Sequence, residues 1–257
     1  MPRAPQSRPG NIYTDLSVYY DLFCAEVDYV EQCAFAQRAF TAFTQTNGRD
    51  YLDLACGSGQ HLLTMQAYGF VPHGLDNSSE MLALAAARCP AAQLQLCDLA
   101  AFEQQAAFDL ITCFLYSIHY SHPLAALRET LARSFAALKP GGVLLFNAVD
   151  ARGIKNDAGI TTHLNRGDEQ LRFSSAWHYR GEGEVLDLKL DISRHHPEGV
   201  ERWQDQHRMT ALVFSELEAA LQALGFEVHI LEHDYSTLRS WDGESFNAVF
   251  VACKPQA

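Results

Sequence analysis

The chain has 257 residues, of which 48% are hydrophobic, and this length and composition fit one large domain with an elaboration. Its formal net charge of -12 argues against a nucleic-acid partner, because binding to a phosphate backbone requires a basic surface. Its apolar runs fall short of the ~20 residues that a membrane helix needs, so we expect no membrane partner.

The chain begins with a segment that we expect to be a flexible arm. Residues 1–16 carry basic residues and prolines but lack the apolar stretch of a signal peptide. Residues 17–43 place aromatic and apolar side chains at helical spacing, which predicts one or two helices before the first strand.

Residues 51–61, with the sequence YLDLACGSGQH, combine an apolar strand, a glycine turn and the start of a helix. Gly57 and Gly59 allow the backbone to approach a nucleotide closely. Asp53 lies on the strand before the turn, and Leu62 occupies the place of the third glycine of a dinucleotide-binding loop. An acid there suits the cationic amino-acid tail of S-adenosyl-L-methionine better than a pyrophosphate. The turn therefore favours this cofactor over NAD.

Strand and helix patterns alternate through the next hundred residues. Helical patterns cover residues 79–88 and 123–138. Repeated strand–helix units predict a parallel sheet with helices on both faces. The predicted strands, in chain order, are residues 51–55, 71–75, 93–97, 108–115 and 142–148.

The pattern changes after residue 148. Residues 150–168 are polar and contain glycines, which indicates a loop. Apolar and polar residues then alternate in three runs, which predicts an antiparallel meander that caps the pocket. These runs are residues 171–179, 186–192 and 203–209, followed by a predicted helix at 215–224 and strands at 226–231 and 248–253.

The predicted fold is α/β, with a Rossmann-like, mostly parallel sheet of seven strands and helices on both faces. An antiparallel β cap is inserted after the fifth strand of this sheet. We divide the chain into an arm (1–16), cap helices with the cofactor-binding core (17–149), the substrate-cap insertion (150–210) and the C-terminal completion of the core (211–257).

Polar side chains end the second and third predicted strands. Asp76, about 20 residues after the glycine turn, is placed to accept both ribose hydroxyls, and Asn77 can reach the same ribose. Asp98 can accept from an adenine amino group, and the backbone N–H of Leu99 can bond a ring nitrogen. Met81 is placed to pack on the adenine. The simpler alternatives are a helix cap for Asp76, a turn former for Asp98 and a core side chain for Met81.

With an acid in each of these places, residues 51–147 resemble the core of a class I S-adenosylmethionine-dependent methyltransferase. Three further segments resemble the aminosugar N,N-dimethyltransferases: residues 19–23, residues 55–62 and residues 205–207. That resemblance implies that Tyr20 and His61 lie near the cofactor.

Candidate catalytic residues come from three separate segments. Asp205 and His207 are two residues apart, so in a strand they share a face, where the carboxylate can orient the imidazole as a base. Tyr116, His119 and Tyr120 follow the fourth predicted strand and compete for the same role. A surface pair, or a histidine buried for structural reasons, is the simpler explanation of His207.

Cysteine and histidine usage favours a reduced protein without a dedicated metal site. The seven cysteines contain no CxxC pair, which indicates free thiols in the cytoplasm. His195 and His196 are adjacent, so in a strand they would face opposite ways and not share a metal ion. We therefore predict a cytoplasmic location and no bound metal.

The predicted activity is transfer of a methyl group to an N or O atom of a small molecule, with S-adenosyl-L-homocysteine as product. The alternatives are a nicotinamide-dependent oxidoreductase and a non-catalytic methyltransferase-like protein that binds the same cofactor. We expect a monomer or a homodimer. The predicted cofactor-binding residues are Tyr20, Asp53, Ala55, Gly57, Gly59, His61, Asp76, Asn77, Met81, Asp98, Leu99 and Phe114. The predicted catalytic residues are His207, His119, Tyr116 and Tyr20.

Overall fold

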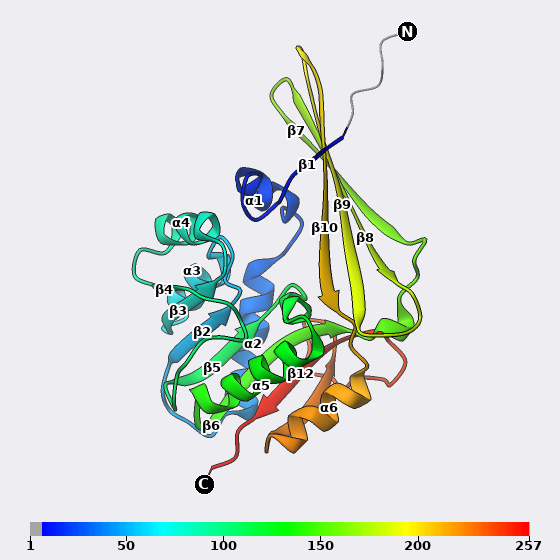
Figure 1. Ribbon diagram of the computed structural model, residues 1–257. Helices are drawn as coiled ribbons and strands as arrows, with labels where there is room; N and C mark the ends of the chain where they lie inside the picture. Colours follow the sequence, from blue (N-terminus) through cyan, green and yellow to red (C-terminus); the bar gives the residue numbers. More distant parts are fainter. Residues whose placement is uncertain (1–6, 257) are drawn as a thin grey trace.

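The computed structural model describes residues 7–256 and contains two β-sheets (Figure 1). The larger sheet has seven strands in the order β11-β12-β6-β5-β2-β3-β4, which confirms the predicted Rossmann-like α/β class. Its strands are β2 (Asp50–Leu54), β3 (Val71–Asp76), β4 (Gln93–Leu96), β5 (Phe108–Cys113), β6 (Leu138–Val149), β11 (Glu227–Glu232) and β12 (Asn247–Cys253).

The strands of the larger sheet are parallel except at one edge. β2 pairs in parallel with β3 and β5, β3 with β4, and β5 with β6, whereas β12 runs antiparallel to β6 and β11. The carboxyl ends of β2, β3, β4 and β5 therefore meet at one edge of the sheet. In an open α/β sheet this edge is where ligands bind.

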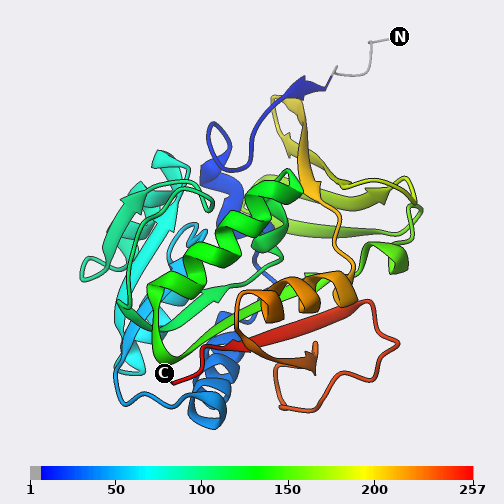
Figure 2. The same cartoon turned by 60° about the horizontal axis from the view of Figure 1, so that its bottom comes forward.

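Helices cover both faces of this sheet (Figure 2). Apolar residues of α5 and α6 pack in one core cluster, and those of α2 and α3 pack in a second cluster on the other face. The burial of β5 and β12 follows from this double cover, because a strand sandwiched between helices must be apolar on both sides. The helices are α1 (Tyr20–Phe23), α2 (Tyr29–Phe43), α3 (Gln60–Ala67), α4 (Ser79–Arg88), α5 (Leu124–Ala137) and α6 (Phe214–Ala223), with short 3-10 turns η1 (Ser17–Tyr19), η2 (Ser117–Tyr120) and η3 (Ala151–Gly153).

The second sheet is a mostly antiparallel cap: its four long strands follow β6, and the short strand β1 from the N-terminal segment pairs in parallel with β10. Its order is β1-β10-β9-β8-β7, and its long strands pair along their full length. The strands are β1 (Arg8–Pro9), β7 (Gly159–Arg166), β8 (Glu169–Tyr179), β9 (Val185–His196) and β10 (Gly199–Thr210). The division of the chain into four functional segments stays a prediction.

Two sequence predictions are wrong in this region. The predicted loop at 150–168 contains β7, because Ile160 and Thr162 favour extended backbone and β8 supplies the hydrogen-bonding partner. The predicted flexible arm is anchored to the cap in its described part, although Arg8 and Pro9 are exposed. Ile12 and Leu16 are buried against the cap, and the backbone N–H of Ile12 donates to the buried Asp205. Residues 1–6 of that predicted arm lie outside the described residues.

Candidate active site

The glycine turn between β2 and α3 is built from left-handed backbone. Ala55, Gly57 and Gly59 have φ angles of 56°, 53° and 82°. The backbone N–H of Gly57 donates to Asp76 Oδ2 at 2.9 Å, and Ser78 N–H donates to Asp76 Oδ1 at 2.9 Å. Asp76 therefore braces the turn from the neighbouring strand. The cap of α4 is Ser78, whose hydroxyl accepts from the N–H of Met81, so the alternative of a helix cap for Asp76 is wrong.

Two predicted cofactor contacts, Gly59 and Met81, have packing roles in the structure. A Cβ at Gly59 would lie 2.9 Å from the Cα of Ala85, so this glycine lets α3 begin close against α4. Met81 is fully buried in α4. Neither residue lines the cavity described below. Met81 is thus a core side chain, and the cofactor contacts of Gly59 and Met81 stay predictions.

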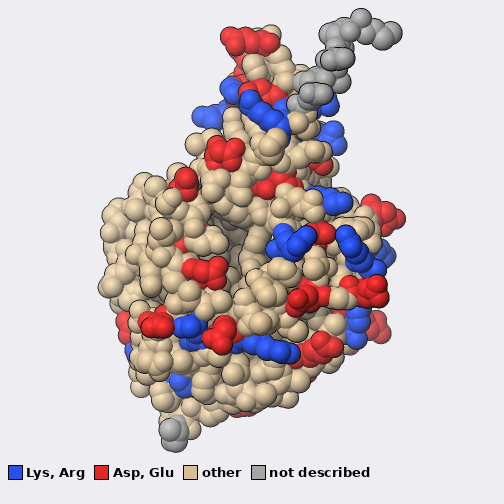
Figure 3. All heavy atoms as spheres, viewed as in Figure 1, with Lys and Arg blue, Asp and Glu red and all other residues tan. Residues whose placement is uncertain are grey.

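A cavity of about 530 Å³ lies between the carboxyl edge of the larger sheet and the inner face of the cap, and Figure 3 shows it as a hollow. This volume is within the range of about 300–1,000 Å³ typical of small-molecule sites. The sheet side is lined by Ala55, Gly57, Leu75, Asp76, Asn77, Cys97, Asp98 and Leu99. The cap side is lined by Ile160, Thr162, Phe173, Ser175, Trp177, Leu188, His207 and Met209.

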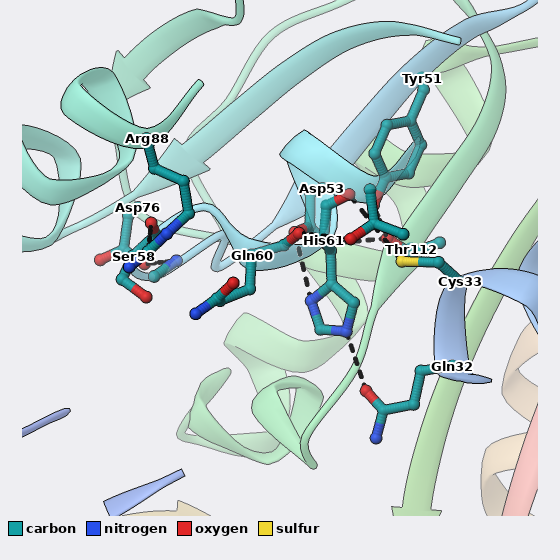
Figure 4. Close-up of polar contacts among 12 residues, drawn as sticks. Gln32, Cys33, Tyr51, Asp53, Ser58, Gln60, His61, Asp76, Arg88 and Thr112 are labelled. Atoms are coloured by element: carbon teal, nitrogen blue, oxygen red, sulfur yellow. Dashed lines mark hydrogen bonds and ion pairs between the residues drawn. The ribbon is translucent and has the colours of Figure 1, made fainter. Parts of the chain in front are cut away.

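Asp53 lies in a smaller pocket that shares Tyr20 and Ala55 with the main cavity. Its Oδ1 accepts from the Thr112 hydroxyl at 2.7 Å, but within residues 7–256 its buried Oδ2 has no hydrogen-bond partner (Figure 4). Burial raises the pKa of Asp53 to about 7. A buried carboxylate oxygen without a donor fits a cationic ligand group such as an ammonium.

His61 adds a second acceptor beside this carboxylate. Its Nε2 lies 2.8 Å from Gln32 Oε1, and its Nδ1 lies 3.8 Å from Asp53 Oδ2 (Figure 4). Burial lowers the pKa of His61 to about 4, so the ring is neutral at pH 7. Because Nε2–H donates to Gln32, the Nδ1 lone pair faces Asp53. Phe114 also lines this pocket, with its ring 5.4 Å from that of His61.

Asp205 and His207 form the buried pair that their spacing predicts. His207 Nε2 lies 2.9 Å from Asp205 Oδ2, and the N–H of Ile12 donates to the same oxygen at 2.9 Å. Burial raises the pKa of Asp205, but the hydrogen bonds from His207 and Ile12 outweigh it and hold this pKa below its ordinary value. The ionised carboxylate can only accept, so Nε2 of His207 is the donor in this contact.

Tyrosines surround this histidine. The hydroxyls of Tyr13 and Tyr120 are 2.8 Å apart, and the His207 ring lies 5.2 Å from Tyr13 and 5.5 Å from Tyr120. Tyr20 lies 5.7 Å from Tyr13. Sequence reasoning missed Tyr13 because it lies in the segment predicted as an arm. The apolar residues Ile12 and Leu16, four positions apart in an otherwise polar segment, could have indicated that it packs against the protein.

The loop after β5 supplies one predicted catalytic residue to the cavity wall and buries the other. Tyr116 lines the cavity, and its φ of 61° follows a φ of 54° at Leu115, an arrangement that side chains disfavour and that is typical of functional loops. His119 is fully buried, donating from Nδ1 to the carbonyl of Thr210 at 2.8 Å and accepting at Nε2 from the N–H of Val149 at 3.1 Å. Both ring nitrogens are occupied, and burial lowers the pKa of His119 to about 4, so it is a structural histidine.

All seven cysteines are free thiols, and six of them are buried. Burial raises the pKa of Cys56 and Cys113 well above the ordinary value, so these thiols stay protonated. In the part of the chain that the structure describes, no group of three or more His, Cys, Asp or Glu residues could hold a metal ion. No helix within residues 7–256 is long and apolar enough to cross a membrane.

Comparisons with known proteins find methyltransferases. The family described as "Methyltransferase domain" matches residues 52–142. A Streptomyces fradiae protein named dTDP-3-amino-3,6-dideoxy-alpha-D-glucopyranose N,N-dimethyltransferase is 29% identical, over 70% of this chain and 71% of its own length.

Two solved structures are similar over nearly the whole chain. DesVI of Streptomyces venezuelae has a TM-score of 0.80 and 25% identity, and the match covers 95% of this chain and 99% of DesVI. CalS10 of Micromonospora echinaspora, an amino pentose methyltransferase solved with bound S-adenosylmethionine, has a TM-score of 0.76 and 24% identity. That match covers 96% of this chain and all of CalS10, at 100%.

Proposed function

This chain is an S-adenosylmethionine-dependent methyltransferase, and from that premise we propose that it methylates an N or O atom of a small molecule held between the sheet and the cap. The observation that carries the acceptor side of this proposal is the buried Asp205–His207 pair on the cavity wall. His207 lies beside Tyr13 and Tyr120, whereas the glycine turn lies on the sheet side of the cavity.

The residues at the sheet edge fit the cofactor. The unpaired Oδ2 of Asp53 and the Nδ1 of His61 offer two acceptors to the α-ammonium group. Asp76 and Asn77 are proposed for the ribose hydroxyls. Asp98 with Leu99 is proposed for the adenine, since all four residues line the main cavity. Tyr20, Ala55 and Phe114 are proposed to pack along the amino-acid tail.

When bound, the cofactor supplies an electrophilic methyl carbon on a sulfonium centre. The protein's own contribution is alignment, exclusion of water and removal of a proton. His207 is proposed to take the acceptor's proton at Nδ1, while Asp205 holds the Nε2–H and stabilises the imidazolium that forms. The hydroxyls and rings of Tyr13, Tyr20 and Tyr120 enclose this point and limit the access of water.

An amino group on a sugar is a second candidate acceptor. It is supported by the relative from Streptomyces fradiae, whose name specifies N,N-dimethylation of a nucleotide-linked amino sugar. The match includes the core but only 70% of this chain. Acceptor identity therefore rests on the lining of the cap side.

Binding and product formation test the proposal separately. Calorimetry with the purified full-length protein is expected to show binding of S-adenosyl-L-methionine and S-adenosyl-L-homocysteine and not of NAD. With S-adenosyl-L-methionine and a panel of small amines and alcohols, S-adenosyl-L-homocysteine is expected to accumulate. Binding of NAD alone would contradict the cofactor assignment, and cofactor binding without product from any amine or alcohol would contradict the acceptor assignment.

A further inference from the structure

The cap side of the cavity indicates the class of acceptor, given the function proposed above. We propose that the acceptor is a ring-bearing, largely apolar molecule without phosphate groups. In this proposal it lies along the row Trp177–Leu188–His207, with its N–H or O–H at His207. Three independent features of the cavity lead to this proposal: the register of the cap, the chemistry of its inner face and the sign of the charges around it.

The register of the cap places these three side chains in one row. Trp177 on β8 is opposite Leu188 on β9, and Leu188 is opposite His207 on β10. Paired residues in neighbouring strands lie on the same face, and neighbouring strands are about 4.8 Å apart. Trp177 and His207 are therefore separated by about 10 Å of strand spacing, with Leu188 between them. This span matches a fused pair of six-membered rings with its nucleophile at one end.

The inner face of the cap is largely apolar around this row, with the hydroxyls of Thr162 and Ser175 as its small polar groups. On the same face, Met209 lies two residues from His207 on β10, and Phe173 lies four residues from Trp177 on β8 with Ser175 between them; all of these residues line the cavity. Tyr116 closes the row from the loop after β5, with its ring 5.6 Å from that of Trp177 at an interplanar angle of 84°. Edge-to-face aromatic walls of this kind favour a flat apolar ligand.

The charges around the cavity disfavour an anionic acceptor. Its carboxylate-bearing lining residues are Glu26, Asp76 and Asp98, and the chain as a whole carries a net charge of -12. Arg172 and Arg208 on the cap alternate with the lining residues Phe173 and His207, so their side chains leave from the opposite face. Figure 3 shows a hollow whose visible walls are largely uncharged. A diphosphate placed here would meet acids and lack the bidentate partner that phosphates prefer.

The acceptor class is tested by binding to the complex of full-length protein with S-adenosyl-L-homocysteine. The ring-bearing probes are 2-naphthol, which carries an O–H, and 1,2,3,4-tetrahydroisoquinoline, which carries an N–H. The nucleotide probes are dTDP and dTDP-3-amino-3,6-dideoxy-α-D-glucopyranose. We expect calorimetry to show at least about tenfold tighter binding of one ring-bearing probe than of either nucleotide, about 1.4 kcal/mol. Tighter binding of a nucleotide probe, or no binding of either ring-bearing probe, overturns the proposal.

Substitutions of Trp177 locate the binding site. Trp177→Ala is expected to weaken binding of the ring-bearing probe by about tenfold or more. Trp177→Phe is expected to retain most of the wild-type affinity for that probe. His178→Ala is the matched control, because His178 is the next residue on β8 and does not line the cavity. Equal probe affinity in Trp177→Ala and His178→Ala would overturn the assignment of the row.

Cofactor binding separates this proposal from the proposed function. Each variant is first titrated with S-adenosyl-L-homocysteine, which also checks that it is folded. If the wild-type protein does not bind S-adenosyl-L-homocysteine, the methyltransferase function itself is contradicted. Normal cofactor binding combined with preference for the nucleotide probes would overturn only the acceptor class.

Discussion

The two walls of the cavity differ in how they are built. The sheet wall, together with the adjoining smaller pocket, holds fixed hydrogen-bond acceptors. Thr112 positions an oxygen of Asp53 in that pocket, and backbone N–H groups of Gly57 and Ser78 position those of Asp76 on the wall. The cap wall presents mainly apolar surface from Trp177 and Leu188, with one buried base. One wall therefore suits recognition of a ligand by its polar groups, and the other suits recognition by shape and apolar area.

The two walls also differ in how far apart their residues lie in the sequence. The proposed cofactor contacts fall mostly within residues 53–99, on the ends of adjacent parallel strands. The polar groups around the proposed base, in contrast, are Tyr13, Tyr120 and His207 itself, which come from three distant segments. Variants on the sheet wall should therefore change cofactor affinity, and variants on the cap wall should change turnover.

The largest expected effect is on the cap wall. His207→Ala should lower kcat by about 10²–10⁴-fold, the range for loss of a general base, while the affinity for S-adenosyl-L-homocysteine stays unchanged. The deficit should shrink as pH rises and the acceptor loses its proton to solvent. Gln206→Ala is the control, because Gln206 is adjacent on β10 and bonds Asp187 instead. Full activity of His207→Ala at pH 7 would show that His207 is not the general base.

The same difference explains what could be predicted from the sequence. The strands of the larger sheet, and Asp53 and Asp76, follow from local signals: apolar runs and a glycine turn with an acid before it. The shared face of Asp205 and His207 follows from the two-residue period of a strand. In these cases each residue's neighbours in space are set by its neighbours in sequence.

The remaining parts depend on partners that are distant in the sequence. β7 becomes a strand because β8 pairs with it, and the segment around Tyr13 is ordered because Ile12 and Leu16 are buried against the cap. His119 was predicted as catalytic, but its nitrogens bond backbone groups of residues 149 and 210. No local pattern records those contacts.

The second prediction concerns the sheet wall. Asp53→Asn should weaken binding of S-adenosyl-L-homocysteine about 10- to 150-fold, because a hydrogen bond to a charged group contributes about 1.5–3 kcal/mol. The unliganded variant should be more stable than the wild type at pH 8, since the substitution removes a buried charge. Calorimetry and thermal melts measure these opposite changes. A variant with wild-type affinity would show that the ammonium binds elsewhere.

The third prediction follows from the raised pKa of Asp53, which is about 7. This pKa lies above the unfolded value of about 3.9, so the contribution of Asp53 to the stability of the unliganded protein declines as pH rises from about 4 to 7. A bound ammonium favours the ionised form. Cofactor affinity should therefore fall by up to about tenfold per pH unit below 7.

Calorimetry in buffers of different ionisation enthalpy measures the linked proton. Binding of S-adenosyl-L-homocysteine at pH 6 should release a proton, and this release should disappear in Asp53→Asn. Adenosine is a suitable control ligand, because it lacks the amino-acid tail and its affinity should not change with pH through Asp53. A pH-dependence that survives in Asp53→Asn would have to come from another group.

The smallest expected effect joins the two walls. Ser78 caps α4 by accepting from the N–H of Met81 at 3.1 Å, and its hydroxyl donates to the carbonyl of Tyr13 at 2.6 Å. Ser78→Ala should lower the free energy of unfolding by about 1 kcal/mol, which corresponds to a decrease in Tm of about 2–4 °C. Because Tyr13 loses its anchor, the acceptor KM should also rise a few-fold with little change in cofactor affinity. Ser79→Ala is the control, since the exposed Ser79 hydroxyl bonds only Glu80 among the described residues. An unchanged KM would mean that Ile12 and Leu16 hold Tyr13 in place without Ser78, and that the two walls are independent at this point.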